Sequence, residues 1–196
     1  MRRLVFFMHT SLDGFVAGPN GELDWININE EIFDFVATMT DKADTALYGR
    51  VTYEMMQSYW PTAGQKPNAS KHDKEHSEWY SKVSKVVLSK TMSEKGLKNT
   101  TVISDKLADN IDRIKKLDGK NILIFGSPTA SHSLLSLGLV DEFWVFVNPV
   151  LVGQGIPLFK GVTETIPLTL LETKTFSCGV IALHYETKQS SAKTNR

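Results

Sequence analysis

Three short segments of the sequence carry glycine, hydroxyl or cationic residues, which are the residue types that bind phosphate groups. They are Gly49-Arg50-Val51-Thr52, Leu88-Ser89-Lys90 and Gly126-Ser127-Pro128-Thr129. Glycine lets the backbone approach a ligand closely, and arginine or lysine forms charge-assisted hydrogen bonds with phosphate oxygens. Taken singly, each segment is also compatible with a plain turn, a solvated strand end or an ordinary helix start. The third segment lacks the G-x-G-x-x-G spacing, so it does not indicate a Rossmann fingerprint.

The elements that must position these segments follow from the apolar pattern. Strand-length apolar runs lie at residues 4–8, 45–48, 85–89, 101–103, 121–125 and 142–147, and helical patterns lie at 30–41, 51–58, 107–117 and 129–137. This alternation predicts an α/β fold with a mostly parallel sheet and helices on both faces. In such a sheet ligands bind at the carboxyl ends of the strands, where helix N-termini offer free N–H groups.

Two further stretches complete the expected fold. Runs at residues 169–174 and 179–185 have no helix between them, which predicts an antiparallel edge at the C-terminal end of the sheet. Residues 61–77 are polar and contain a proline, so we expect a long surface loop there. We expect one domain over residues 1–187 and a polar tail over residues 188–196.

The composition excludes several classes of protein. Lys+Arg and Asp+Glu both number 22, so no basic excess favours nucleic acid or an anionic membrane as a partner. Cys178 is the only cysteine, which rules out an internal disulfide and is typical of a reducing compartment. With one cysteine and scattered histidines we expect no metal site. No apolar stretch approaches the ~20 residues of a membrane span, and we expect a cytoplasmic protein.

Several acidic and polar residues are candidates for work on a substrate. A carboxylate with a raised pKa can act as a general acid, and the candidates are Asp24, Glu30 and Glu31. The alternative for Glu30 and Glu31 is that they complement the dipole at the start of the predicted helix. Trp25 can stack on a substrate ring or simply pack, and Gln154 can bind a polar substrate or belong to a plain turn.

Six segments in this order resemble the dihydrofolate-reductase superfamily. The most similar members are the reductase domain of the bifunctional riboflavin-biosynthesis deaminase-reductase and its stand-alone relatives. The segments are residues 11–17, 47–54, 87–90, 124–127, 138–142 and 149–159. The resemblance extends to about residue 186 and implies a dihydrofolate-reductase-like three-layer fold.

The resemblance also implies NADPH as the cofactor, lying across the carboxyl ends of the strands. It implies that Gly49, Arg50, Val51 and Thr52 meet the pyrophosphate and the adenosine-ribose phosphate. Leu88, Ser89 and Lys90 would flank the adenosine and its 2′-phosphate, and Gly126, Ser127, Pro128 and Thr129 would hold the pyrophosphate from the other side. Val16 and Ala17 would touch the nicotinamide. The family often has two or three consecutive glycines where this chain has only Gly126.

The leading functional hypothesis is therefore an NADPH-dependent reductase of a small heterocycle, such as a pterin or an aminopyrimidine with a ribityl or ribosyl chain. The alternative is an NADP(H)-binding protein without reductase activity, acting as a sensor or sequestering protein. A flavodoxin-like or Rossmann domain is a third hypothesis, which the missing glycine spacing disfavours. Residues 143–147 are apolar on both faces, so they predict either a central strand or one that joins a partner. Because the riboflavin-type reductases are dimeric, the resemblance implies a homodimer.

Overall fold

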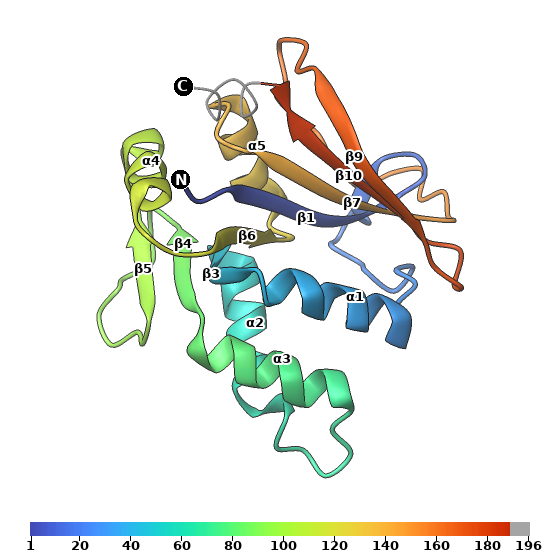
Figure 1. Cartoon of the computed structure of the whole chain (residues 1–196), viewed down its shortest axis with the longest axis horizontal. Coiled ribbons are helices and arrows are strands. Elements are labelled where there is room, and N and C mark those ends of the chain that lie inside the picture. The colour runs from blue at the N-terminus through green and yellow to red at the C-terminus, as the bar shows by residue number, and fades with distance from the viewer. Residues whose placement is uncertain (189–196) are drawn as a thin grey trace.

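The computed structural model describes residues 1–188, and residues 189–196 of the predicted polar tail lie outside the described residues. An eight-stranded sheet forms its middle layer, in the order β5-β4-β3-β6-β1-β7-β10-β9 (Figure 1). The strands are β1 (Leu4–Ser11), β3 (Ala43–Gly49), β4 (Ser84–Leu88), β5 (Thr100–Ile103), β6 (Asn121–Phe125), β7 (Glu142–Asn148), β9 (Leu168–Thr175) and β10 (Ile181–Thr187). The strands from β5 to β7 pair in parallel, whereas β10 pairs antiparallel with both β7 and β9. This confirms the predicted parallel sheet with an antiparallel C-terminal edge.

Helices cover both faces of the sheet. They are α1 (Glu30–Thr40), α2 (Arg50–Ala63), α3 (Lys71–Lys82), α4 (Leu107–Lys116) and α5 (Pro128–Ser136). Ile32 of α1, Tyr53 of α2 and Tyr80 of α3 are buried in one core, while Ile111 of α4 and Leu134 of α5 are buried in the other. Two cores separated by one sheet give the predicted three layers (Figure 1). None of the helices within residues 1–188 has the length and apolar character that crossing a membrane requires.

The prediction of a long surface loop over residues 61–77 is wrong. Helix α2 continues through Pro61 to Ala63, and α3 begins at Lys71. Ser70 and Asp73 form a capping box, because the Ser70 Oγ accepts from the Asp73 N–H at 3.1 Å and the Asp73 carboxylate accepts from the Ser70 N–H at 3.0 Å. Helix α3 buries little apolar surface, so its hydrophobic period is weak and the cap was the stronger signal in the sequence.

Residues 143–147 form a central strand. They belong to β7, which pairs with β1 on one side and β10 on the other. Phe143, Trp144, Val145 and Phe146 are all buried, on alternating faces of the sheet. The central-strand alternative is therefore confirmed, and this strand offers no surface to a partner.

Lys85 on β4 is a buried cation with few partners. It is only 5% exposed, its Nζ donates to the Val83 carbonyl at 3.1 Å, and it lies 4.5 Å from the centroid of the Tyr80 ring. Burial lowers its pKa below the ordinary value of 10.5. Within residues 1–188 no carboxylate forms a salt bridge with it.

Lys85→Met is expected to raise the free energy of unfolding at pH 7 by about 1 kcal/mol, because burying an unpaired charge is costly. In the unmodified chain that free energy should also rise as the pH climbs from the lowered pKa of the folded state toward 10.5, since the unfolded chain binds the proton more readily in that window. Urea unfolding between pH 7 and 10 measures both effects. The exposed Lys116→Met is the control, and an unchanged pH slope in the Lys85 variant would contradict the prediction.

Candidate functional site

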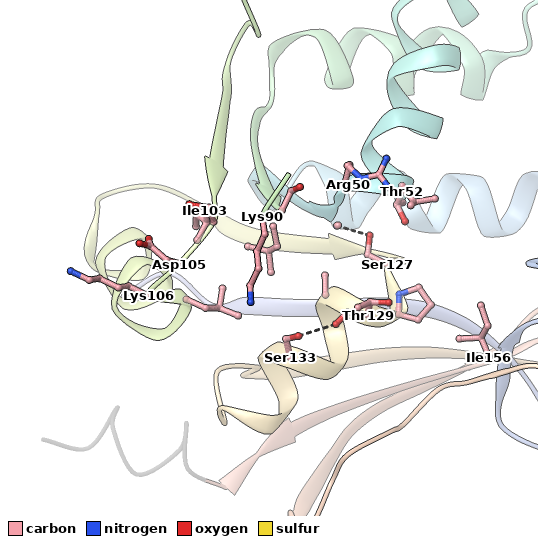
Figure 2. A pocket seen from close by; sticks show the side chains of 18 residues that line it. Arg50, Thr52, Lys90, Ile103, Asp105, Lys106, Ser127, Thr129, Ser133 and Ile156 are labelled. Atoms are coloured by element: carbon pink, nitrogen blue, oxygen red, sulfur yellow. Dashed lines mark hydrogen bonds between the residues drawn. The ribbon is translucent and has the colours of Figure 1, made fainter. Parts of the chain in front are cut away.

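A pocket of about 830 Å³ lies at the carboxyl ends of β3, β4, β5 and β6 (Figure 2). All three predicted phosphate-binding segments meet at this pocket. Its lining includes Gly49, Arg50, Val51, Thr52, Leu88, Ser89, Lys90, Ser127, Pro128 and Thr129. Parallel strands bring these segments together because their carboxyl ends share one edge of the sheet.

Three helices begin at the pocket with free first turns. The N-cap residues of α2, α4 and α5 are Gly49, Lys106 and Ser127, and none of them forms a side-chain capping hydrogen bond in the described part of the chain. By contrast α1 and α3, whose N-caps do not line the pocket, are capped by the side chains of Asn29 and Ser70. The first N–H groups and the partial positive charge of these helix starts therefore face one cavity, which suits an anion at α2 and α5, whereas α4 has Asp109 in its first turn.

Direct contacts join the first and third predicted segments. The Gly49 N–H donates to the Ser127 Oγ at 2.9 Å, and the same hydroxyl donates to the Phe125 carbonyl at 3.2 Å. Ser127 has φ +59, a left-handed conformation that costs a residue other than glycine roughly 1–2 kcal/mol. Ser127 therefore adopts a left-handed backbone conformation at the position where the resembled family often has a second glycine. Its hydroxyl accepts the hydrogen bond from Gly49 at the start of α2.

The two cations of the predicted segments differ in their availability. The Arg50 guanidinium bonds both oxygens of Glu54 at 2.9 and 2.8 Å, so it must share or leave that carboxylate to reach a phosphate. The Lys90 side chain extends into the space between the end of β4 and α5 (Figure 2). Within residues 1–188 Lys90 forms no ion pair. Lys90 is therefore the freer cation of the two.

A fourth strand-to-helix junction also lines the pocket and was missed from the sequence. Its residues are Ile103, Ser104, Asp105, Lys106 and Leu107. The signal was present, because a strand predicted to end at residue 103 and a helix predicted to begin at residue 107 imply a junction of the same kind. Ala130, Ser133 and Ile156 complete the lining.

Three residues expected at the cofactor are not part of the pocket lining. Gly126 donates its backbone N–H to the Phe7 carbonyl at 3.3 Å. Val16 and Ala17 are 3% and 5% exposed and belong to β2 (Phe15–Ala17), which pairs with β8 (Ile156–Pro157). Ile156 does line the pocket, so β2 lies directly beside it, but the buried side chains of Val16 and Ala17 offer a ligand little surface.

Beyond Ile156 the carboxyl ends of β1 and β7 form a second region. We call it the β1–β7 edge: residues 9–11, the loop 18–29, the start of α1, residues 148–155 and the turn 176–179. Asn148, which is fully buried, joins these parts, because its Nδ2 donates to the Thr10 carbonyl at 3.1 Å and its Oδ1 accepts from the Asn27 N–H at 2.9 Å. The Asn29 Nδ2 donates to the Ser177 Oγ at 3.0 Å. These contacts place the parts of the edge side by side.

Asp13 and Gly155 fix the 150–155 loop of this edge against β2. The Asp13 carboxylate accepts from the N–H groups of Val152 and Gly153 at 3.1 and 2.8 Å, and from the Ser11 hydroxyl at 2.6 Å. Those hydrogen bonds, the Ser11 hydroxyl first, lower the Asp13 pKa. At Gly155 an added Cβ would come within 2.1 Å of the Ala17 carbonyl oxygen, so the loop passes β2 at a distance that only glycine permits.

The predicted proton donors all lie in or beside the β1–β7 edge. Glu31 accepts from the Ser177 N–H at 2.9 Å, and the hydrogen bonds from Ser177 lower its pKa, the opposite of what a general acid needs. Asp24 and Glu30 are exposed. Glu30 and Glu31 occupy the first turn of α1, as the helix-dipole alternative requires.

The two substrate-binding candidates of this region, Trp25 and Gln154, and the nearby His9 are aromatic or neutral. Trp25 is half-buried and its Nε1 donates to the Glu22 carbonyl at 3.2 Å, while Gln154 is exposed in the 150–155 loop. Burial lowers the pKa of His9 to about 4, so this imidazole is neutral at pH 7, with its Nδ1 3.4 Å from the Asn148 Nδ2. Residues 1–188 contain no group of three histidine, cysteine or acidic side chains placed to hold a metal ion.

Comparison with known proteins shows which family the whole chain resembles. The model of the RibD C-terminal domain family matches residues 2–182. The protein YyaP of Bacillus subtilis (strain 168) is 34% identical over 187 residues, which are 94% of each chain. A candidate riboflavin biosynthesis protein from Shewanella sp. PV-4 has a TM-score of 0.72 and 25% identity, covering 95% of this chain and 99% of that one.

Two more distant structures share the fold. The diaminohydroxyphosphoribosylaminopyrimidine deaminase/5-amino-6-(5-phosphoribosylamino)uracil reductase of Thermotoga maritima has a TM-score of 0.66 and 13% identity, over 95% of this chain and 56% of that one. Dihydrofolate reductase from Enterococcus faecalis, solved with NADP(H), has a TM-score of 0.60 and 13% identity, over 95% and 96%. The fold is therefore that of the dihydrofolate-reductase superfamily, as predicted.

Proposed function

Because the chain belongs to the RibD C-terminal domain family, we propose that it is an NADPH-dependent reductase of a small heterocycle, such as a pterin or a ribosylaminopyrimidine. One observation carries the proposal: within residues 1–188, three helices without a side-chain cap start at one pocket, beside the cation Lys90, which forms no ion pair there. A dinucleotide has a pyrophosphate for such helix ends, and NADPH adds a 2′-phosphate that needs a cation. The E. faecalis neighbour, which shares the fold, was solved with NADP(H).

The lining residues fit the parts of this cofactor. The first turns of α2 and α5, with Thr52 and Thr129, would hold the pyrophosphate from its two sides. Lys90 and Ser89 would hold the adenosine 2′-phosphate. Ile103 and Leu107 supply an apolar wall for the adenine.

The cofactor supplies a hydride when it is bound, and the chain orients it and the substrate. The nicotinamide would lie toward Ile156, where the pocket adjoins β2 and the β1–β7 edge. The candidate acids are Asp24, Glu30 and Glu31, and the hydrogen bonds from Ser177, which lower the Glu31 pKa, disfavour Glu31 as the proton donor. Trp25 and Gln154 would contact the substrate from the loops of the edge.

NADPH is expected to raise the melting temperature, because a ligand that binds only the folded state stabilises it. At about one hundred times the dissociation constant the gain is about 2.7 kcal/mol, or roughly 5–10 °C for a chain of this size. Differential scanning fluorimetry measures the shift, with NADH at the same concentration as the control. An equal shift with NADH would contradict the role of Lys90, and no shift with either would reject the cofactor site.

NADPH oxidation in the presence of pterins and aminopyrimidines separates the two remaining functions. Turnover with any of them supports the reductase. Firm NADPH binding without turnover of any of them favours the second candidate, an NADP(H)-binding protein without reductase activity. The hydrogen bond from the Ser177 N–H to Glu31 favours this second candidate, because it lowers the Glu31 pKa and so disfavours one of the candidate proton donors.

A further inference from the structure

Positive side chains are missing from the segments that build the β1–β7 edge. The sequence has no lysine or arginine between Arg3 and Lys42, between Lys120 and Lys160, or between Lys174 and Lys188. These three intervals contain every residue of the edge. The cations that line the neighbouring pocket, Arg50, Lys90 and Lys106, all lie on its other side, at the ends of β3, β4 and β5.

Two lysines from outside the intervals approach the α1 side of the edge, and both are engaged. The Lys174 Nζ lies 4.9 Å from the centroid of the Phe35 ring and 5.3 Å from that of Phe176, and its charge acts on Glu31. The Lys71 Nζ is paired with the Asp34 carboxylate at 2.8 Å. Neither ammonium is free to bind an anion without losing these partners.

The helix that starts at this edge is also closed to anions. The Asn29 side chain accepts from the Ile32 N–H at 3.0 Å, and Glu30 and Glu31 fill the first turn of α1. Asp13 and Asp24 add further negative charge in the adjoining loops. Helix starts that bind phosphate keep their first N–H groups free, as α2 and α5 do without any acid in the first turn. Within residues 1–188 the edge therefore offers a phosphate group neither an uncapped helix start nor a disengaged lysine or arginine.

From this distribution of charge we infer the class of substrate. We propose that the chain reduces a flat heterocycle that is neutral or bears a protonated amine, and that carries no phosphate group. The proposal rests on the proposed reductase function. The proposed substrate differs from that of the T. maritima enzyme, whose name specifies a phosphoribosyl substrate. In the reaction a hydride would add to the carbon of a C=N bond, which is a ring bond in a pterin and the imine of the opened sugar in a ribosylaminopyrimidine; the nitrogen would gain a proton from the acid or from water, and NADPH would become NADP⁺.

The test is a matched comparison on the complex with NADP⁺, so that cofactor binding is established separately. The probes are ribosylaminopyrimidine and its 5′-phosphate, and a hydroxyalkyl pterin and its phosphate ester, measured by calorimetric titration. We expect the unphosphorylated member of at least one pair to bind at least tenfold more tightly than its phosphate. Tighter or equal binding of a phosphorylated member overturns the proposal. Failure of all four compounds to bind also overturns it, while leaving NADPH binding intact.

A gain of charge at the edge gives a second readout that does not depend on turnover. Leu151 is 71% exposed in the 150–155 loop, and Leu117 is 56% exposed at the end of α4, away from the edge. Leu151→Lys should strengthen binding of the two phosphorylated compounds by roughly threefold, as expected for one screened surface charge. Binding of the two unphosphorylated compounds should stay unchanged. Leu117→Lys should change neither. An equal effect of both variants would contradict binding at this edge.

Discussion

Lys90→Ala is expected to weaken NADPH binding by roughly 10–100-fold while leaving NADH binding nearly unchanged. A hydrogen bond to a charged group contributes about 1.5–3 kcal/mol, and each 1.4 kcal/mol is about a factor of ten in affinity. Lys90 extends into the pocket and has no ion pair within residues 1–188, so its loss leaves no neighbouring acid unpaired. Titration of the fluorescence of bound NADPH and NADH measures the two affinities.

Lys116→Ala is the matched control, because Lys116 is an exposed lysine at the far end of α4 and does not line the pocket. An equal loss of NADPH and NADH affinity in the Lys90 variant would show that the lysine acts on the pyrophosphate and not on the 2′-phosphate. Unchanged NADPH affinity would remove Lys90 from the site.

Gly155→Ala is expected to lower the free energy of unfolding by roughly 2–4 kcal/mol, because the new methyl group overlaps backbone that cannot move aside cheaply. Its Cβ would stand 2.1 Å from the Ala17 carbonyl oxygen and 3.2 Å from the Gly18 Cα. Relief requires separating β2 from β8, which carries Ile156 of the pocket wall. NADPH affinity should therefore fall together with stability, and urea unfolding and NADPH titration on the same samples measure both.

Gly153→Ala tests whether the effect comes from this contact. Gly153 has φ +78 in the same loop, but an added Cβ there meets nothing within 4 Å. Its expected cost is only that of the left-handed backbone, about 1–2 kcal/mol. Equal losses in the two variants would mean that backbone conformation, and not the approach to Ala17, sets the requirement for glycine.

Much of the fold was predictable because the apolar period is strong where the sheet is buried on both faces. Val5 and Phe6 are neighbours in β1 yet lie in different cores, and such runs identify parallel strands. Helix α3 was missed because it buries only His76 and Tyr80 and its apolar pattern is weak. The start of α3 is encoded by the capping box at Ser70 and Asp73, and not by a hydrophobic period.

The convergence of the three phosphate-binding candidates on one pocket followed from the sequence, whereas the assembly of the β1–β7 edge did not. Gly49 ends β3, and Ser89 and Ser127 follow β4 and β6; because parallel strands end at one edge, sequence position alone brings the three together. The β1–β7 edge is assembled by Asn27, Asn148 and Ser177, which are far apart in the chain and follow no repeating pattern. Whether Glu31 donates a proton depends on its hydrogen bond from Ser177, a tertiary contact that spacing does not encode.

The three free helix starts at the pocket place stability and affinity in conflict. A serine, threonine or aspartate cap on a helix typically contributes about 1 kcal/mol to folding. Lys106 forgoes that gain, Gly49 forgoes only about a few tenths of a kcal/mol because glycine is itself a fair N-cap, and Ser127 directs its hydroxyl to Gly49 and Phe125 and not to its own helix. An aspartate at position 49 would cap α2, yet it would put a carboxylate where the proposed pyrophosphate would lie. Selection for heat resistance would favour capping side chains at these three positions, whereas selection for the proposed ligand would favour uncapped helix starts. The capped helices α1 and α3 are not subject to this trade-off.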